Sequence, residues 1–323
     1  MSGRWKWDFE DEPAATRRSP PPPQPRQPRP PPAAELARRR AQFRRRRGGA
    51  ALAVVLLIAL IVALSASHHG GSASTSRPRV THGSALPPGT PKSLLADERG
   101  AVDATLAYTP FVREGGGRGR DIALTFDDGP GPYTPGVLAA LEQAHTRATF
   151  FPIGRMERYF GASTVRQIRD GDVIGNHTEN HPEMARLSPH EQHEELVEGE
   201  ARVELAGGPR PQLFRPPYGS FNAVTMRELQ RQRLLMVLWS VDTGDYEQPG
   251  VPVIIQRVLE GAHPGAIMLL HDGGGDRAQT VAALPGIIRA LRARGYRLVT
   301  VPQLLMDDPP PRGLPLPPNL SGD

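Results

Sequence analysis

Apolar runs of strand length alternate with helical stretches from residue 121 to residue 301, and this alternation constrains the fold more than any other feature of the sequence. The apolar runs lie at 121–126, 148–153, 172–175, 212–214, 234–241, 266–270 and 296–301. The helical stretches lie between them at 135–144, 164–169, 189–205, 223–231, 253–260 and 282–294. This order predicts one α/β domain with a parallel sheet and crossover helices, either open or closed into a barrel.

Reactive side chains follow five of these runs directly. They are Asp127 and Asp128, Asn176 and His177, Arg215, Asp242 and Asp245, and His271 and Asp272. In parallel βα folds the carboxyl ends of the strands share one face, where active sites are assembled. The sequence therefore predicts that these side chains meet in one site.

The first run ends in two adjacent carboxylates. Asp127 and Asp128 precede Gly129 and Pro130, which cannot continue a strand. The two charges repel each other, so a cation, a metal or exposure to water must compensate them. On this stretch alone, a solvated turn and a pair made of a metal ligand and a base both remain open.

Two histidines four residues apart extend the candidate site. His177 and His181 are expected on one side of a helical turn, a spacing that suits one metal, although an isolated pair of this kind is commonly a surface feature. Together with Asp128 they form a ligand set for zinc, cobalt or iron, with positions left open for water and substrate. The nearby His190 and His193 lie in a strongly charged helical stretch, which predicts a solvated face.

Five ordered motifs carry a resemblance to a known family. They are T-F-D-D-G-P at 125–130, H-T-x-x-H at 177–181, R-P-P-Y-G at 215–219, D-T-x-D at 242–245 and L-L-H at 269–271. In this order they resemble the polysaccharide deacetylase family, which is the NodB-type homology domain or carbohydrate esterase family 4. The resemblance covers residues 119–306 and implies a distorted (β/α) barrel of about seven parallel strands. It also implies hydrolysis of N-acetyl or O-acetyl groups on a glycan.

The resemblance assigns a metal site and a general base. It implies that Asp128, His177 and His181 are the metal ligands, with Zn²⁺ as the expected ion and Co²⁺ or another divalent ion as the alternative. Asp127 would be the general base that deprotonates the attacking water, and Arg215 would pair with this base and keep it ionised.

The resemblance also assigns the acid and the substrate contacts. His271 would be the general acid that protonates the leaving amine, oriented by Asp245, and the backbone N–H of Tyr218 would stabilise the oxyanion. Tyr246 stands where the family usually has Trp, so an aromatic cover of the acid is retained. Leu270, together with the residue before it, is expected either to line a pocket for the acetyl methyl group or to pack in the core.

One residue of the fourth motif receives no role. Asp242 is as compatible with capping the end of a strand as with catalysis.

The N-terminal part differs in composition from the rest. Residues 1–49 hold 13 Lys and Arg against 5 Asp and Glu, and a proline-rich run occupies 20–32, so we expect a disordered tail. Because the chain as a whole carries +5, residues 50–323 sum to −3, which argues against a nucleic-acid binder. The absence of cysteine fits an exported protein without disulfides and excludes Cys-based zinc or thiol chemistry.

An apolar segment predicts a membrane anchor. Residues 50–64 contain no polar side chain, and four arginines precede them, so 50–66 is expected to span the membrane with the tail in the cytoplasm. A cleaved signal peptide and a buried core helix are the alternatives. We expect an extracytoplasmic linker at 67–118, in which 93–106 shows helical periodicity, and a proline-rich C-terminal tail at 307–323.

These features predict a membrane-anchored, extracytoplasmic, metal-dependent deacetylase acting on N-acetyl sugars of peptidoglycan. An anchored enzyme meets glycans near the outer membrane face more often than free polysaccharide, which favours wall glycan as its partner. The alternatives are a deacetylase of chitooligosaccharide, poly-N-acetylglucosamine or acetyl xylan and, from another class, a non-catalytic glycan-binding wall protein. The oligomeric state is not predicted by the sequence.

Overall fold

The structure is a computed structural model that describes residues 92–318. The predicted cytoplasmic tail and the predicted transmembrane segment lie outside the described residues, as does the first part of the predicted linker. From residue 92 to residue 318, no helix is both long enough and apolar enough to cross a membrane.

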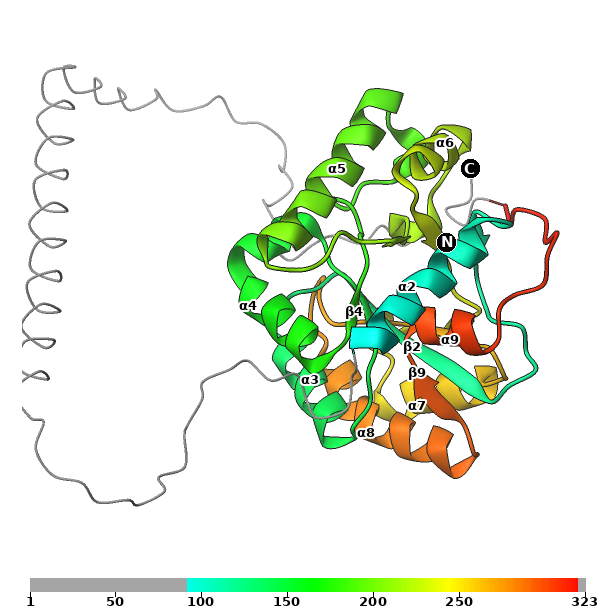
Figure 1. Cartoon of the computed structure of the whole chain (residues 1–323). Coiled ribbons are helices and arrows are strands. Elements are labelled where there is room, and N and C mark those ends of the chain that lie inside the picture. The colour runs from blue at the N-terminus through cyan, green and yellow to red at the C-terminus, as the bar shows by residue number, and fades with distance from the viewer. Residues whose placement is uncertain (1–91, 319–323) are drawn as a thin grey trace, which may run out of the picture. The chain divides into compact units, whose positions relative to one another are not determined.

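Parallel strands form the centre of the fold (Figure 1). One sheet has the order β4-β3-β2-β8-β7 with β9 also paired to β2, and the other has the order β1-β6-β5. The strands are β1 (Phe111–Val112), β2 (Asp121–Asp127), β3 (Thr149–Phe151), β4 (Val173–Ile174), β5 (Leu213–Phe214), β6 (Leu235–Val237), β7 (Val241–Asp242), β8 (Ile267–His271) and β9 (Arg297–Val299).

Two isolated bridges, one parallel and one antiparallel, connect the two sheets. Asn176, just after β4, bridges to Phe214 of β5, and Glu114, just after β1, bridges to Ala266 before β8. The strands therefore close into an irregular ring, which is consistent with the expected (β/α) barrel. All strand pairs within the two sheets are parallel, so their carboxyl ends point the same way.

Helices surround this ring. They are α2 (Lys92–Leu106), α3 (Thr134–Gln143), α4 (Gly154–Asp170), α5 (Pro189–Leu205), α6 (Ala223–Gln232), α7 (Val251–Gly261), α8 (Ala278–Ala293) and α9 (Val301–Asp307), with short 3₁₀ turns η1 (Met184–Arg186), η2 (Pro217–Gly219) and η3 (Asp245–Glu247). Local signals set several of their ends. Ser188 and Glu191 form a capping box at the start of α5, and Gly171 ends α4 in the left-handed conformation.

Strand β2 is buried on both faces. Leu124 and Phe126 point outward into a core shared with α3, α7 and α8, whereas Ala123 points into the interior of the ring. All seven residues of β2 are buried, as expected for a parallel strand covered on both sides. Burial on both faces fixes the register of this strand, and with it the position of the carboxylates at its end.

Helices α2 and α9 close the interior of the ring at the end where the strands start. Val102 of α2 and Leu304 of α9 join the inward-facing side chains of β2, β3, β5, β6 and β8 in one core. Glu98 of α2 is buried and accepts hydrogen bonds from Arg147, just before β3, at 3.0 and 2.9 Å and from Thr300 at 2.8 Å. The strand ends on the opposite side of the ring remain for the site.

Most predicted elements are present, with four differences. Helix α9, which begins at the last residue of the final predicted run, was not predicted. The run at 234–241 is divided between β6 and β7, because the chain crosses from one sheet to the other after β6. Helix α4 begins ten residues before the predicted stretch at 164–169, since Gly154 and Gly161 weaken its helical pattern. Within the predicted linker, α2 confirms the helical periodicity at 93–106, whereas β1 was not predicted, and both elements pack against the ring.

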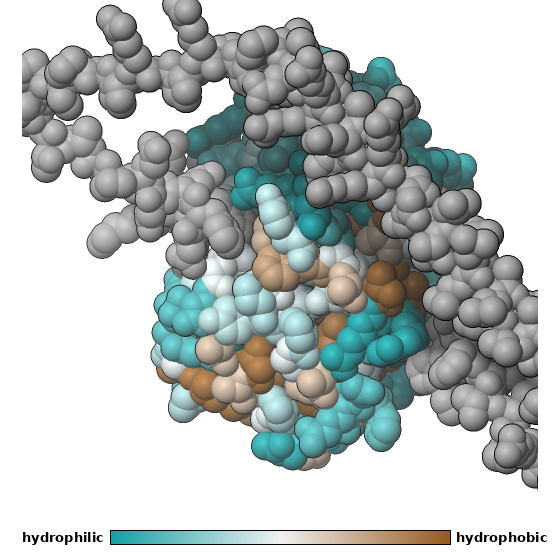
Figure 2. All heavy atoms as spheres, turned by 90° about the vertical axis from the view of Figure 1, so that its left-hand side faces the viewer, coloured by the Kyte–Doolittle hydropathy of each residue, from teal (hydrophilic) through white to brown (hydrophobic). Residues whose placement is uncertain are grey.

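The surface mixes polar and apolar side chains. On the face that Figure 2 shows, hydrophobic residues are interspersed with hydrophilic ones. The large apolar side chains exposed along α4 and α5 are Tyr159, Val165, Val197 and Leu205. Scattered apolar residues of this kind are ordinary for a folded domain.

Candidate functional site

Asp128, His177 and His181 converge at the carboxyl ends of the strands. All three are buried, and one ligand atom from each lies within 4.8 Å of the others. Nε2 of His181 lies 3.1 Å from Oδ1 of Asp128, and Nε2 of His177 lies 3.5 Å from the same oxygen. Among the residues that the structure describes, this is the one group of three or more such side chains with metal-binding spacing.

The protonation of this cluster suits a cation. Nδ1 of His177 donates to the backbone oxygen of Arg215 at 2.6 Å, which leaves Nε2 without a proton when the ring is neutral. The buried Oδ1 of Asp128 accepts no hydrogen bond of good geometry from the described residues, although both imidazoles face it. Lone pairs that face each other in a buried site repel, and a divalent cation between them removes this repulsion. The residues therefore fit a metal.

The pKa shifts of the cluster agree with this conclusion. Burial alone would raise the pKa of Asp128, but its electrostatic interactions with the facing imidazoles, His181 first, hold this pKa well below its usual range. Burial lowers the pKa of His181, more than Asp128 raises it. An ionised carboxylate and a neutral imidazole are the forms that bind a metal.

The two histidines do not lie on a helical turn, so that prediction was wrong. Residues 177–183 form an irregular loop in which Thr178 and His181 have φ values of +70° and +63°. This left-handed backbone turns the loop back on itself, so the imidazole rings lie 4.9 Å apart between centroids. Asn176 supports the turn by accepting from the N–H of Thr178 at 2.9 Å.

Asp127 is paired with a buried guanidinium. Oδ1 of Asp127 accepts from Arg215 at 2.7 Å, and Arg215 also donates to Thr125 at 2.8 Å. The Arg215 side chain is fully buried and donates further to the backbone oxygens of Val237 and Leu238. Arg215 therefore places a buried guanidinium directly against the Asp127 carboxylate. The structure thus brings together the two residues that were expected to pair.

His271 and Asp245 form a second pair at the same edge. Nδ1 of His271 lies 2.8 Å from Oδ1 of Asp245, whose other oxygen accepts from the backbone N–H of His271 at 2.9 Å and from Thr280 at 2.7 Å. Burial alone would lower the pKa of His271, but the charge of Asp245 and the hydrogen bond to it raise this pKa to about 9. A histidine of this kind is charged at neutral pH and can donate a proton.

Two tyrosines flank the histidines. The Tyr246 ring stands edge-on to His271 with centroids 5.2 Å apart, and its hydroxyl donates to Asp242 at 3.1 Å. Asp242, which had no role in the sequence, also accepts from the N–H of Gly244 at 2.9 Å and so caps the turn after β7. Tyr218 lies in η2 with φ +59°, and its ring packs edge-on against His181 at 4.6 Å.

Leu270 packs in the core rather than at the site. It is fully buried in the layer between β8 and the outer helices, together with Phe126 and Leu284. The core alternative for this residue was therefore the correct one. Side chains alternate along a strand, so Leu269 and His271 share one face and Leu270 lies on the other. The sequence already contained this signal, because His271 was expected at the site.

Some residues near the site had no predicted role. Asp272 is buried directly after His271, and burial raises its pKa to about 7 although a hydrogen bond from Thr134 opposes the shift. The sequence did contain one sign that Asp272 lies near the site, since it directly follows the expected acid His271.

His190 and His193 lie on α5 with side chains 80% and 52% exposed, as predicted, and pair with Glu194 and Glu228.

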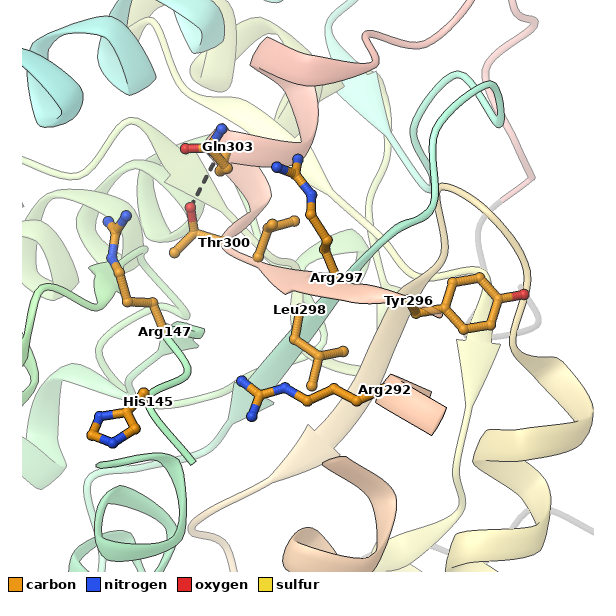
Figure 3. Close-up of a pocket in the computed structure, with 9 residues that line it drawn as sticks. His145, Arg147, Arg292, Tyr296, Arg297, Leu298, Thr300 and Gln303 are labelled. Carbon is orange, nitrogen blue, oxygen red and sulfur yellow. Dashed lines mark hydrogen bonds between the residues drawn. The ribbon is translucent and has the colours of Figure 1, made fainter. Parts of the chain in front are cut away.

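Two cavities lie away from this edge. One of about 480 Å³ is lined by Arg147, Arg292 and Arg297 beside β9 (Figure 3), and one of about 990 Å³ lies between α2 and α9. The charge of Arg147 is balanced by an ion pair with Glu98, and the charge of Arg297 by an ion pair with Asp121. Neither cavity is lined by Asp128, His177 or His181, which together are called the metal cluster below.

Comparisons with known proteins agree with the geometry. A family model described as polysaccharide deacetylase matches residues 114–237. A peptidoglycan-N-acetylglucosamine deacetylase of Bacillus cereus is 44% identical over 189 residues, which are 57% of this chain and 87% of that protein. A chitooligosaccharide deacetylase of Bradyrhizobium sp. is 38% identical over 198 residues, 57% of this chain and 90% of the relative.

Solved structures give the same result and add one contrast. The Bc1960 peptidoglycan N-acetylglucosamine deacetylase matches with a TM-score of 0.59 and 34% identity, over 61% of this chain and 93% of that one. BA3943 of Bacillus anthracis, described as a pseudoenzyme of carbohydrate esterase family 4, matches with a TM-score of 0.58 and 30% identity, over 61% and 69%. On these matches, the chain belongs to the polysaccharide deacetylase family of metal-dependent hydrolases.

Proposed function

We propose that this chain is a membrane-anchored deacetylase that removes N-acetyl groups from peptidoglycan sugars. The observation that carries the catalytic part is the convergence of Asp127, the metal cluster and His271 at one edge of the ring, from segments far apart in the sequence. The resemblance to the Bacillus cereus relative supports peptidoglycan as the substrate. We interpret the ring of strands as the distorted barrel of about seven strands.

The metal belongs to the first part of the proposal. Asp128, His177 and His181 would hold a divalent cation, which we expect to be Zn²⁺. When bound, such an ion acts as a Lewis acid on the acetyl carbonyl.

The remaining steps use side chains and backbone of this chain. Asp127 takes a proton from the attacking water while the water oxygen forms a bond to the acetyl carbon and the carbonyl π bond opens. Arg215 keeps the Asp127 carboxylate ionised beforehand. The backbone N–H of Tyr218 donates to the oxygen on which negative charge develops. His271 then gives its proton to the sugar nitrogen as the C–N bond breaks, so acetate and a free amine leave. Asp245 holds the imidazole in position for this transfer.

The anchor and the location are parts of the same proposal. The uninterrupted apolar residues 50–64 and the arginines before them support a segment at 50–66 that crosses the membrane. The catalytic domain would then lie outside the cytoplasm, close to newly made wall glycan. No partner other than glycan and membrane is proposed.

One experiment tests both the substrate and the metal requirement. The full-length chain is incubated with peptidoglycan fragments, chitooligosaccharide and acetylated xylan, and released acetate is measured with and without a chelator. We expect acetate from the peptidoglycan fragments, loss of activity on chelation and recovery with Zn²⁺ or Co²⁺. His190→Ala serves as a control that leaves activity unchanged, because this side chain is 80% exposed on α5.

Two outcomes would contradict the proposal in different ways. Acetate from xylan alone would exclude peptidoglycan as the substrate and leave the chemistry intact. Metal binding without acetate release from any of the three glycans would favour the non-catalytic alternative. BA3943, described as a pseudoenzyme of the same family, is a precedent for the loss of activity alone.

A further inference from the structure

Asp272 lies next to the turn after β2 that carries the carboxylates of Asp127 and Asp128. Strands β2 and β8 pair with Asp127 opposite His271, so the residues that follow each strand leave the sheet side by side. The backbone N–H of Asp272 donates to the oxygen of Asp127 at 3.1 Å. The Asp272 side chain is only 1% exposed, so its carboxyl group faces the protein interior.

A short hydrogen-bond chain connects this carboxyl group to the turn. The N–H of Gly131 donates to Oγ1 of Thr134 at 2.7 Å, and Oγ1 of Thr134 donates to Oδ2 of Asp272 at 2.6 Å. Thr134 is fully buried and is the first residue of α3. These hydrogen bonds therefore connect three segments: the turn after β2, the start of α3 and the turn after β8.

The two turns also fit together without room for side chains. A Cβ on Gly129 would lie 2.4 to 2.6 Å from the Asp272 carboxyl group, and a Cβ on Gly273 would lie 2.1 Å from the backbone oxygen of Asp128. Between them, Asp128 has φ +72°, a left-handed conformation that is unfavourable for a residue with a side chain. Such a conformation persists only where the surroundings determine it.

We propose that Asp272, acting through Thr134, is a positioning residue that holds the turn of Asp127 and Asp128 in the conformation required for metal binding and proton abstraction. The proposal rests on the proposed function only for its kinetic readout. The metal readout stands by itself, since the ligand cluster is independent of the glycan that the enzyme uses.

The chain offers a matched control for the Thr134 hydroxyl. Thr164 of α4 is also fully buried and also donates to a carboxylate, Oε1 of Glu157, at 2.8 Å. Thr134→Val and Thr164→Val remove the same group from the same kind of environment and keep the side-chain shape. Loss of thermal stability alone is therefore expected to be similar in both variants.

The first measurement is Co²⁺ binding to the full-length chain. We expect Thr134→Val to lose about 10–100-fold in Co²⁺ affinity, the usual range for residues that orient metal ligands, and to change the absorption spectrum of the Co²⁺-loaded protein. Thr164→Val should match the wild type in both readouts. Equal Co²⁺ affinity and spectrum in the two variants would overturn the proposal.

The second measurement tests the carboxyl group. Asp272→Asn keeps an oxygen that can accept from Thr134, whereas Asp272→Ala removes it. We expect Asp272→Asn to retain Co²⁺ affinity and kcat within about threefold, and Asp272→Ala to lose both by the range expected for Thr134→Val. An Asp272→Asn variant as impaired as Asp272→Ala would contradict the acceptor role. If Asp272→Ala does not fold, the Thr134→Val comparison still decides the proposal.

A failure of the proposed function would look different. If the wild-type chain binds Co²⁺ but releases no acetate, the deacetylase proposal fails, while the Co²⁺ affinities of the Thr134 and Asp272 variants still test the positioning role.

Discussion

Asp127 and Asp128 are neighbours in the chain, yet the structure gives them different surroundings. Asp127 faces the guanidinium of Arg215 at 2.7 Å, and Asp128 faces the imidazoles of His177 and His181. Asp127→Asn should therefore keep the metal and lose the base. We expect kcat to fall by about 10²–10⁴-fold with Zn²⁺ affinity nearly unchanged, measured by acetate release and metal titration. A parallel loss of metal would mean that Asp127 is a ligand instead.

The pair of His271 and Asp245 predicts a pH dependence. Only protonated His271 can act as an acid, so kcat/KM should fall as pH rises through its pKa, which Asp245 raises to about 9. A divalent cation held by Asp128, His177 and His181 would disfavour the charged imidazole and would place this alkaline limb below pH 9. Asp245→Asn removes the stabilising anion, so the limb should move to still lower pH. An unchanged limb in this variant would exclude His271 as the group responsible.

For single residues, the sequence predicted which residues form the site better than it predicted which way each side chain points. The motifs identified the metal cluster, the paired Arg215 and the paired Asp245, all of which the structure brings together. For Leu270 the sequence left two alternatives open, because adjacent apolar residues do not reveal which one faces the core until a neighbour of known direction is used. The contact between Thr134 and Asp272 joins residues 138 positions apart, and no sequence pattern marks it.

Among the elements, α2 shows how a segment outside the motifs supports the domain. Its Glu98 accepts two hydrogen bonds from Arg147 and one from Thr300 in a buried position. Glu98→Ala leaves these donors unsatisfied and should lower the free energy of unfolding by about 3 kcal/mol, measured by urea denaturation. Asp97→Ala is the control, because this neighbouring side chain is exposed. A loss of less than about 0.5 kcal/mol, typical of surface sites, would contradict the anchoring role of α2.

The predicted boundaries failed where local signals were weak or ambiguous. The H-x-x-x-H spacing fits a helix as well as a loop, and the loop is produced by left-handed residues such as Thr178, which spacing does not reveal. Helix α9 was not predicted, although Thr300 caps it and Pro302 occupies its first turn. By contrast, α5 begins and ends at the predicted residues, because Pro189 and the capping box mark its start.

For the whole molecule, the proposed anchor predicts where the catalytic domain resides. If 50–66 is a retained anchor, a reporter fused after Asp323 should be exported, and the N-terminal tail should be protected from protease added to intact cells. The full-length chain should also remain with the membrane after a salt wash, since its attachment would be hydrophobic. Release of a mature form beginning near Ser67 would favour a cleaved signal peptide instead.

The placement of α2 has a consequence for how the molecule can be attached to a support. Arg99, Asp103 and Glu98 of this helix contact residues that immediately precede β5, β6 and β3. Asp308, after α9, contacts Arg118 and Gly119 before β2. The described chain therefore begins and ends on the closed side of the ring. Attachment of the domain through a side chain of α2 or at Asp308 would therefore hold it on the closed side of the ring and leave the opposite edge, with the site, open to a polymer.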